Sequence, residues 1–320
     1  MKLQTQIPLK KETRNLINYH SKILLLGSCF SENIGDKLDY FKFQSTQNPF
    51  GILFHPKAIE NLISNAINEK EYLDNDLIFK NERWHSFDAH SSLSSSDNNK
   101  LLNNLNSAVT ATNKQLKEAT HIIITLGTSW VYRFIESDII VANCHKIPQK
   151  KFLKELLSVA KITAILEAKI ALLKSVNKDV NVLFTVSPVR HLKDGFIENT
   201  QSKSHLIAAI HNVIDARKNT HYFPSYEIMM DELRDYRFYA EDMIHPNKTA
   251  INYIWEKFTA TWFSEDSKST MKEIDVIQKG ISHRPFNKNS KEHQQFLKNL
   301  NDKITEITSK FPSVIFNNKG

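Results

Sequence analysis

Short apolar runs alternate with stretches of helical periodicity along most of the chain. Four runs predict strands, and they are Lys22–Leu26, His121–Leu126, Val180–Val186 and His221–Tyr226. The first two are almost continuously apolar and each ends at a glycine, which is typical of strands buried on both faces of a parallel sheet. Because strands that alternate with helices form βαβ units, we expect an α/β fold with a mainly parallel sheet.

Helical periodicity and capping residues predict helices between these strands. We expect helices over Ser31–Leu38, from Pro56 to about Asn68, from a cap at Asp97 to about Glu118, over Lys151–Lys174, from about Ser202 to Arg217, and from Pro246 to about Phe263. A strand over Phe41–Thr46, a hairpin around Leu77–Trp84 and an antiparallel excursion over Trp130–Val141 complete the expected elements. Beyond Ser264 we expect one helical stretch near Lys291–Ile307 and an apolar end, Phe311–Phe316, that docks back or mediates association.

Composition divides the chain into two parts. Residues 1–263 read as one α/β domain with an insertion around 69–120, and residues 264–320 as a basic extension rich in Lys and Asn. The chain has 42 Lys and Arg against 35 Asp and Glu, and residues 266–320 hold ten of the former and six of the latter. The larger part is therefore nearly neutral, which argues against a body that binds nucleic acid.

Other classes of protein are excluded by what the chain lacks. Cys29 and Cys144 are too few for a disulfide framework, and neither they nor the 13 histidines have metal-ligand spacing. There is no apolar run of about 18 residues and no signal-peptide core near the start. We expect a cytoplasmic protein without a membrane span, metal or other cofactor; the pattern assigns no oligomeric state.

Polar residues follow the predicted strands, where ligands bind in an open α/β sheet. Ser28 follows the first strand, Thr128 the second and Arg190 the third. Asp242 and His245 precede the last helix, and a carboxylate three residues before an imidazole can bend back to hold Nδ1–H and leave Nε2 as a base. Such a base would activate the Ser28 hydroxyl. Each motif alone also fits a plain capped helix start.

The run Gly27-Ser28-Cys29-Phe30 resembles the motif that names the GSCFA-domain proteins, which look like a branch of the SGNH/GDSL hydrolase superfamily. Further blocks with the same resemblance, across roughly residues 20–260, are Asn48-Pro49-Phe50-Gly51, Thr125–Tyr132, Asn143–Pro148, Thr185–His191, Tyr222–Glu227 and Asp242-Met243-Ile244-His245-Pro246. The resemblance implies a flavodoxin-like three-layer α/β/α fold and ester chemistry. It makes Ser28 the nucleophile, His245 the base and Asp242 the residue that orients the base.

The resemblance also implies an oxyanion hole, and here the chain departs from the pattern. The superfamily's glycine block maps onto Gly51, near Asn48, but its third block, which normally carries an Asn, is Gly127–Trp130 with no Asn. Backbone N–H groups of Ser28 and Gly51 are the expected donors, with Thr128 or Asn48 helping. Loss of one such donor typically costs about two to three orders of magnitude in rate.

Other candidates have two interpretations each. We interpret Cys29 as a buried structural thiol and His145 as a wall of the site or a loop anchor. Arg190 binds a substrate carboxylate or phosphate, or it pairs with Asp or Glu. His191 is more often a structural hydrogen bonder than a second base. His85, His90, Ser86 and Ser91 line the rim of the site or belong to a solvated loop.

The pattern as a whole predicts a serine esterase or acyl hydrolase that acts on a small ester or an O-acylated sugar. An acyltransferase would use the same triad, because water and an alcohol attack the same covalent intermediate. A binding protein with a degenerate oxyanion hole, and a protein that reaches an anionic partner through residues 264–320, are the non-catalytic alternatives.

Overall fold

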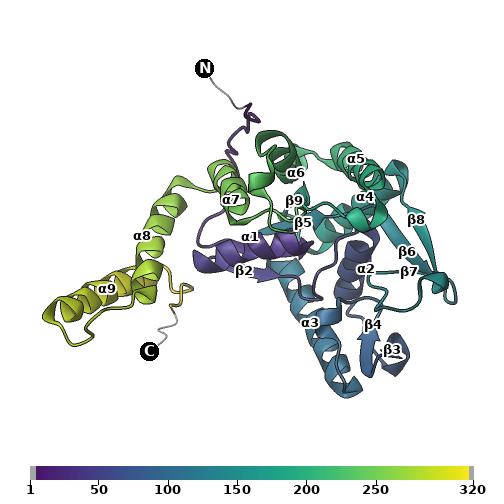
Figure 1. Ribbon diagram of the computed structural model, residues 1–320, viewed down its shortest axis with the longest axis horizontal. Coiled ribbons are helices and arrows are strands. Elements are labelled where there is room, and N and C mark those ends of the chain that lie inside the picture. Colours follow the sequence, from purple (N-terminus) through teal and green to yellow (C-terminus); the bar gives the residue numbers. More distant parts are fainter. Residues whose placement is uncertain (1–4, 317–320) are drawn as a thin grey trace.

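A five-stranded parallel sheet forms the centre of the computed structural model, which describes residues 5–316 (Figure 1). The strand order is β10-β9-β5-β1-β2. The strands are β1 (Lys22–Gly27), β2 (Gln44–Gln47), β5 (His121–Leu126), β9 (Asn181–Val186) and β10 (Thr220–Phe223). Gly27 is in register with Thr125, and Thr125 with Thr185, so the carboxyl ends of β1, β5 and β9 meet at one edge.

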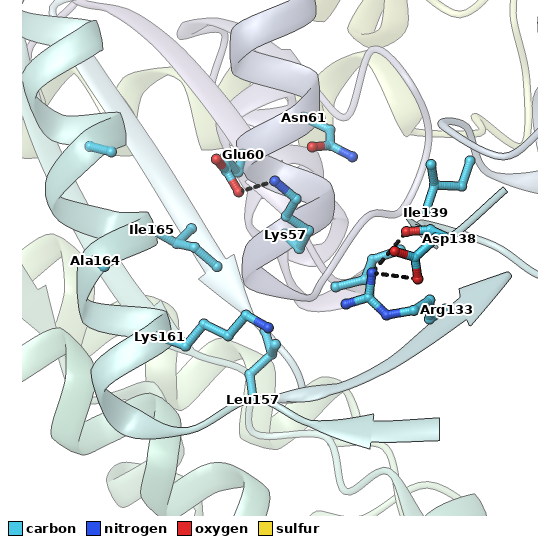
Figure 2. Close-up of a pocket in the computed structure, with 12 residues that line it drawn as sticks. Lys57, Glu60, Asn61, Arg133, Asp138, Ile139, Leu157, Lys161, Ala164 and Ile165 are labelled. Atoms are coloured by element: carbon cyan, nitrogen blue, oxygen red, sulfur yellow. Dashed lines mark hydrogen bonds and ion pairs between the residues drawn. The ribbon is translucent and has the colours of Figure 1, made fainter. Parts of the chain in front are cut away.

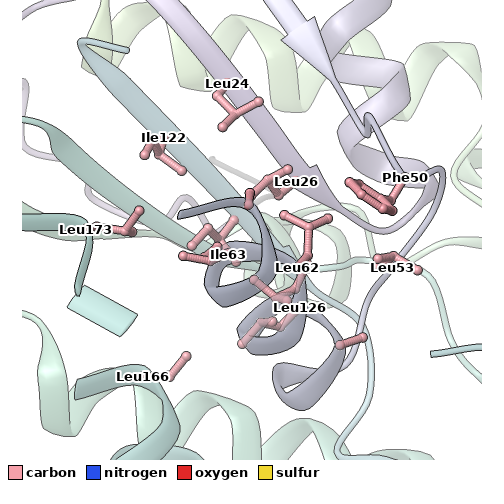
Figure 3. Close-up of a cluster of buried hydrophobic side chains, with 14 of the residues drawn as sticks. Leu24, Leu26, Phe50, Leu53, Leu62, Ile63, Ile122, Leu126, Leu166 and Leu173 are labelled. Carbon is pink, nitrogen blue, oxygen red and sulfur yellow. The ribbon is translucent and has the colours of Figure 1, made fainter. Parts of the chain in front are cut away.

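Helices cover both faces of the sheet, which confirms the three-layer α/β/α arrangement. One face carries α2 (Pro56–Ile67), α3 (Asn98–Glu118), α4 (Val159–Val176) and α5 (Phe196–Val213). The other carries α1 (Cys29–Tyr40) and α7 (Lys248–Trp262), followed by α8 (Glu265–Ser282) and α9 (Lys291–Lys310), while the short α6 (Ser225–Glu227) follows β10. Alternate residues of β1 enter different cores: Leu24 and Leu26 pack with α2 (Figure 3), and Ile23 and Leu25 pack under α1.

Two small antiparallel sheets flank the α2 side. The expected hairpin is formed by β3 (Leu77–Lys80) and β4 (Arg83–Ser86), and the expected excursion by β6 (Trp130–Phe134) and β7 (Ile139–Val141). The prediction of a helix over Lys151–Lys174 is wrong in its first turns, because β8 (Phe152–Leu156) pairs with β6. The helix α4 begins only after Ser158, whose hydroxyl accepts the Lys161 N–H at 3.2 Å.

The extension after Ser264 contains two helices rather than the one expected. In α8, Met271, Ile274 and Ile277 join the core under α1, and the Tyr40 hydroxyl donates to Asp275 at 2.9 Å. The apolar end docks back: the ring of Phe311 lies 4.8 Å from that of Tyr19, and Val314 is buried. The α8–α9 pair projects sideways from the body, at the left of Figure 1.

Candidate functional site

A sharp turn places Ser28 between β1 and α1, at the carboxyl edge of the sheet. Gly27 has φ +139°, and a Cβ there would lie 2.2 Å from the Thr125 carbonyl oxygen, so only glycine fits this turn. Ser28 is the N-cap of α1, and its hydroxyl accepts the Phe30 N–H at 3.2 Å. The Ser28 N–H donates to the Thr125 carbonyl at 3.2 Å. The side chain thus lies at a helix N-terminus, where negative charge is favoured.

A closed loop before α7 joins Asp242 to His245. The loop is fastened by the Ala240 N–H, which donates to the His245 carbonyl at 2.7 Å. The Asp242 carboxylate accepts the N–H groups of Ile244 and His245, at 2.9 and 3.0 Å, and His245 Nδ1 at 2.6 Å. These bonds lower the pKa of Asp242 to about 2, and the two backbone N–H groups contribute more than the imidazole ring. The ionised carboxylate is therefore placed to accept Nδ1–H, which is the arrangement in which Nε2 faces away as a base.

The packing of α1 against α7 brings this loop toward Ser28. Lys37 bonds Asn252, and the ring of Phe41, directly after α1, stacks on Trp255 with centroids 5.9 Å apart. The two helices therefore run in the same direction, and their first turns lie at the same end (Figure 1).

Ser28 and His245 are nevertheless not hydrogen bonded to each other in the described structure. Ser28 is 1% exposed, whereas the side chain of His245 is 49% exposed. The structure thus contains a formed Asp242–His245 pair and a serine at the same edge, without the bond that joins them. Catalytic hydrogen bonds are often long before substrate binds.

The groups expected to form the oxyanion hole make hydrogen bonds within the protein. The Gly51 N–H donates to the Asn48 carbonyl at 2.7 Å. The Oδ1 of Asn48 accepts the Gly27 N–H at 2.9 Å, and its Nδ2 has only a 3.5 Å contact with Glu32. Thr128 bonds the Ser202 hydroxyl at 2.9 Å. Among these donors, Asn48 Nδ2 therefore makes the weakest hydrogen bond.

Arg190 and His191 follow β9 on the side of the His245 loop. The guanidinium of Arg190 lies 5.8 Å from the ring centroid of Tyr239 and contacts the sulfur of Met230, and in residues 5–316 it has no carboxylate partner. Tyr239 forms a β-bridge with Pro246, so Arg190 packs on the loop that carries His245. This geometry favours the substrate-binding interpretation of Arg190 over the structural ion pair.

Lys203 on α5 is a member of the site that sequence reasoning missed. It is 1% exposed, its Nζ donates to the Ser187 carbonyl at 2.8 Å, and no carboxylate of the described chain pairs with it. Burial lowers the pKa of its ammonium to about 7, a shift opposed by Cys29. The signal was available: Lys203 shares the buried face of α5 with Leu206 and Ile210, at helical spacing.

His145 has structural contacts, and both cysteines are half-buried, so Cys29 is less buried than expected. His145 Nε2 bonds the Ser86 carbonyl at 2.7 Å and Nδ1 bonds the Ser91 hydroxyl at 3.2 Å, so the ring ties two loops together. Burial lowers the pKa of His145 to about 4. Cys29 and Cys144 are free thiols whose pKa is raised by burial, to about 11 for Cys144, which leaves both poor nucleophiles at neutral pH.

A separate pocket of about 620 Å³ lies between α2, α4 and the β6–β7 hairpin (Figure 2). Its charged groups are largely paired: Lys57 with Glu60 at 2.7 Å, and Arg133 with Asp138 at 3.4 Å. None of the predicted site residues lines it, and it holds no pairing of a nucleophile with a base. The edge of the sheet near Ser28 is therefore the better candidate for chemistry.

Within residues 5–316, no group of three His, Cys, Asp or Glu side chains is placed to hold a metal ion. No helix in the same part of the chain is both long enough and apolar enough to cross a bilayer.

Comparison with known families and proteins gives two matches. The model of the GSCFA family matches residues 22–258, which include Ser28, Asp242 and His245. The model of the GSCFA domain protein C-terminal domain matches residues 274–319, which cover the second half of α8 and all of α9. No curated protein matches the chain.

Proposed function

From the premise that the chain belongs to the GSCFA family, we propose that it is a serine esterase or acyl hydrolase of the SGNH/GDSL type, working in the cytoplasm on a small ester or an O-acylated sugar. The observation that carries this proposal is the 2.6 Å bond between Asp242 and His245, at the edge of the sheet where Ser28 caps α1. An imidazole held in this way is a base, and a serine at a helix N-terminus is the group that such a base activates.

In the proposed reaction, Ser28 Oγ attacks the ester carbonyl carbon while His245 Nε2 takes the hydroxyl proton. The C–O bond to the alcohol then breaks, and His245 returns the proton to the departing alcohol. Water, deprotonated by His245, then attacks the acyl-serine; the bond from the acyl carbon to Ser28 Oγ breaks, and His245 returns the proton to Ser28 Oγ as the acid leaves. Asp242 stays ionised throughout, in keeping with its pKa of about 2. Because Ser28 is 1% exposed and is not bonded to His245, the reaction requires a movement that uncovers the serine hydroxyl and brings it to His245.

The remaining predicted residues have supporting roles in this proposal. Asn48 and Gly51 hold the turn and offer Asn48 Nδ2 to the substrate, and Thr128 and His145 shape the wall. Arg190, which no carboxylate neutralises in residues 5–316, binds a carboxylate or phosphate of the substrate. Esters with a negative charge are therefore the preferred substrates.

A labelling experiment tests the proposed function. Wild type should be labelled by a fluorophosphonate, with the label mapped to the peptide that holds Ser28, and should cleave p-nitrophenyl esters or O-acetylated sugars. Ser28→Ala and His245→Ala should lose both activities, whereas Cys29→Ser, which alters the thiol next to Ser28, should keep the label. Wild type that is neither labelled nor active on any of these esters would refute the hydrolase proposal.

A non-catalytic binding protein is the second candidate, favoured by two observations: Ser28 and His245 are not bonded, and the Gly51 N–H is occupied. It predicts that wild type and Ser28→Ala bind an acylated sugar equally and that neither turns it over. An acyltransferase instead predicts that added alcohol diverts the acyl group of wild type from water.

A further inference from the structure

His191 carries a buried ring nitrogen without a partner. Its Nε2 is shielded from solvent and has no hydrogen-bond partner in the described structure. The ring is held in place, because it stacks on Phe54 with centroids 4.9 Å apart and the His191 N–H donates to Asn199 at 2.9 Å. A buried polar atom on a fixed ring is costly unless some acceptor or donor meets it. The ring is therefore positioned for a group that the protein itself does not supply.

The position of this nitrogen is set by Gly127, directly after β5. A Cβ on Gly127 would lie 2.7 Å from His191 Nε2 and 3.1 Å from Phe54, so the glycine leaves the space that the imidazole occupies. Two backbone bonds tie this place to the serine turn: Leu53 N–H donates to Gly27 at 3.2 Å, and Gly127 N–H donates to Phe54 at 2.7 Å.

His191 Nε2 consequently lies at the edge of the sheet where β1 and β5 end. In the sheet, Gly27 is in register with Thr125, two residues before Gly127, and the Ser28 N–H bonds the same Thr125. The imidazole and the serine are thus held on adjacent strand ends.

The surroundings of His191 keep its ring neutral. Burial, Lys203 and His245 together lower its pKa to about 3, so it does not carry a proton on both nitrogens at physiological pH. Neither of the two titratable groups that act on the ring, Lys203 and His245, is hydrogen bonded to its Nε2 in the described structure. A neutral imidazole in such a place donates one hydrogen bond and does not compete with His245 as the base.

We propose that His191, as the neutral tautomer protonated on Nε2, donates a hydrogen bond to the oxygen that becomes negative when Ser28 attacks an ester. This inference rests on the proposed hydrolase function and assigns His191 as a catalytic residue of the oxyanion hole. The donor keeps its proton: electrons move from Ser28 Oγ to the carbonyl carbon and onto the carbonyl oxygen, whose charge the N–H stabilises, and they return when the alcohol leaves. Of the donors expected from the sequence, the N–H groups of Ser28 and Gly51 and the Thr128 hydroxyl already have partners, which leaves Asn48 Nδ2, with a 3.5 Å contact to Glu32, as the other available donor.

Kinetics of His191 variants test the inference on an ester that wild type cleaves. His191→Phe keeps a ring to stack on Phe54 but removes the donor, and it should lower kcat about 10²- to 10³-fold with KM little changed. His191→Gln, which restores an N–H donor, should recover at least tenfold of that loss. The exposed His211 gives a matched control, since His211→Phe should leave kcat unchanged. His191→Phe with wild-type kcat would overturn the inference.

Nuclear magnetic resonance of the ring nitrogens gives a readout that does not depend on turnover. The His191 ring should be neutral and protonated on Nε2 from about pH 5 to about pH 8. Protonation on Nδ1 instead, or titration within that range, would overturn the assignment even in an active enzyme. If wild type is inactive and unlabelled while the tautomer is as expected, the proposed function has failed, and the oxyanion role falls with it.

Discussion

Replacing Lys203 by Met should make the stability of the protein less dependent on pH. The ammonium of this lysine is 1% exposed, bonds only the Ser187 carbonyl at 2.8 Å, and has no carboxylate partner among the described residues. Burial lowers its pKa from an ordinary value of 10.5 to about 7. The folded chain thus loses this proton near pH 7, while the unfolded chain keeps it until about pH 10.5.

The sign and size of the effect follow from proton linkage. Between the two pKa values the unfolded state binds more protons, so the stability of wild type rises with pH in this window. Burying the charge costs about 5 kcal/mol well below pH 7 and about 1.5 kcal/mol at about pH 9.5, on the basis of about 1.4 kcal/mol for each pKa unit. Wild type should therefore gain about 3 kcal/mol relative to Lys203→Met between about pH 6 and about pH 9.5.

Urea unfolding of both proteins at the two pH values measures this difference directly. At about pH 6 the variant should be the more stable, by about 2–4 kcal/mol, after about 1–3 kcal/mol is lost because the Ser187 carbonyl is left without its donor. Lys114→Met, on the exposed side of α3, is the control and should show no such dependence. A difference between wild type and Lys203→Met that stays constant across the two pH values would refute the reasoning.

Three further substitutions test other parts of the account. Gly27→Ala should lower the free energy of unfolding, measured by urea denaturation, by about 2–6 kcal/mol, because the φ of +139° is strained for alanine and the new Cβ would clash with the Thr125 carbonyl. A loss below about 1 kcal/mol would contradict that geometry. Asp242→Asn should reduce kcat about 10²- to 10⁴-fold, because an amide does not hold the Nδ1–H of His245 as the carboxylate does. Unchanged ester turnover would show that His245 needs no carboxylate partner. Arg190→Met should raise KM about tenfold or more for esters that carry a carboxylate and should leave KM for neutral esters unchanged. Equal effects on both kinds of ester would show that Arg190 does not recognise the substrate's charge.

Local signals in the sequence predicted most of the layers of the fold. The helices that start at Pro56 and after Asp97 lie where their capping residues place them, because a cap is satisfied within a few residues of itself. Both glycine-terminated apolar runs are central strands. The strand β8 was missed because it is stabilised by its pairing with β6, about twenty residues earlier in the chain. The β-propensity of a segment does not show which distant strand it pairs with.

The candidate site could be predicted only in part, for the same reason. The Asp242–His245 bond spans three residues, so spacing was enough to predict it. The bond from the Gly51 N–H to the Asn48 carbonyl closes a four-residue turn, so spacing could also have predicted it. The bond between Thr128 and Ser202 joins residues 74 positions apart, and no spacing rule connects them. The burial of Lys203 and the orphaned nitrogen of His191 arise where strand ends and α5 meet, and only the assembled structure brings these together.

The most direct test of the central claim is to trap the acyl group on Ser28 during turnover. Wild type mixed with p-nitrophenyl acetate and quenched with acid should carry an acetyl group on the peptide that contains Ser28, as measured by mass spectrometry. The group should be absent from Ser28→Ala and should not accumulate in His245→Ala, where the serine is not activated. Acetate released by wild type with no acetyl group on Ser28, or with the group on another residue, would contradict the account.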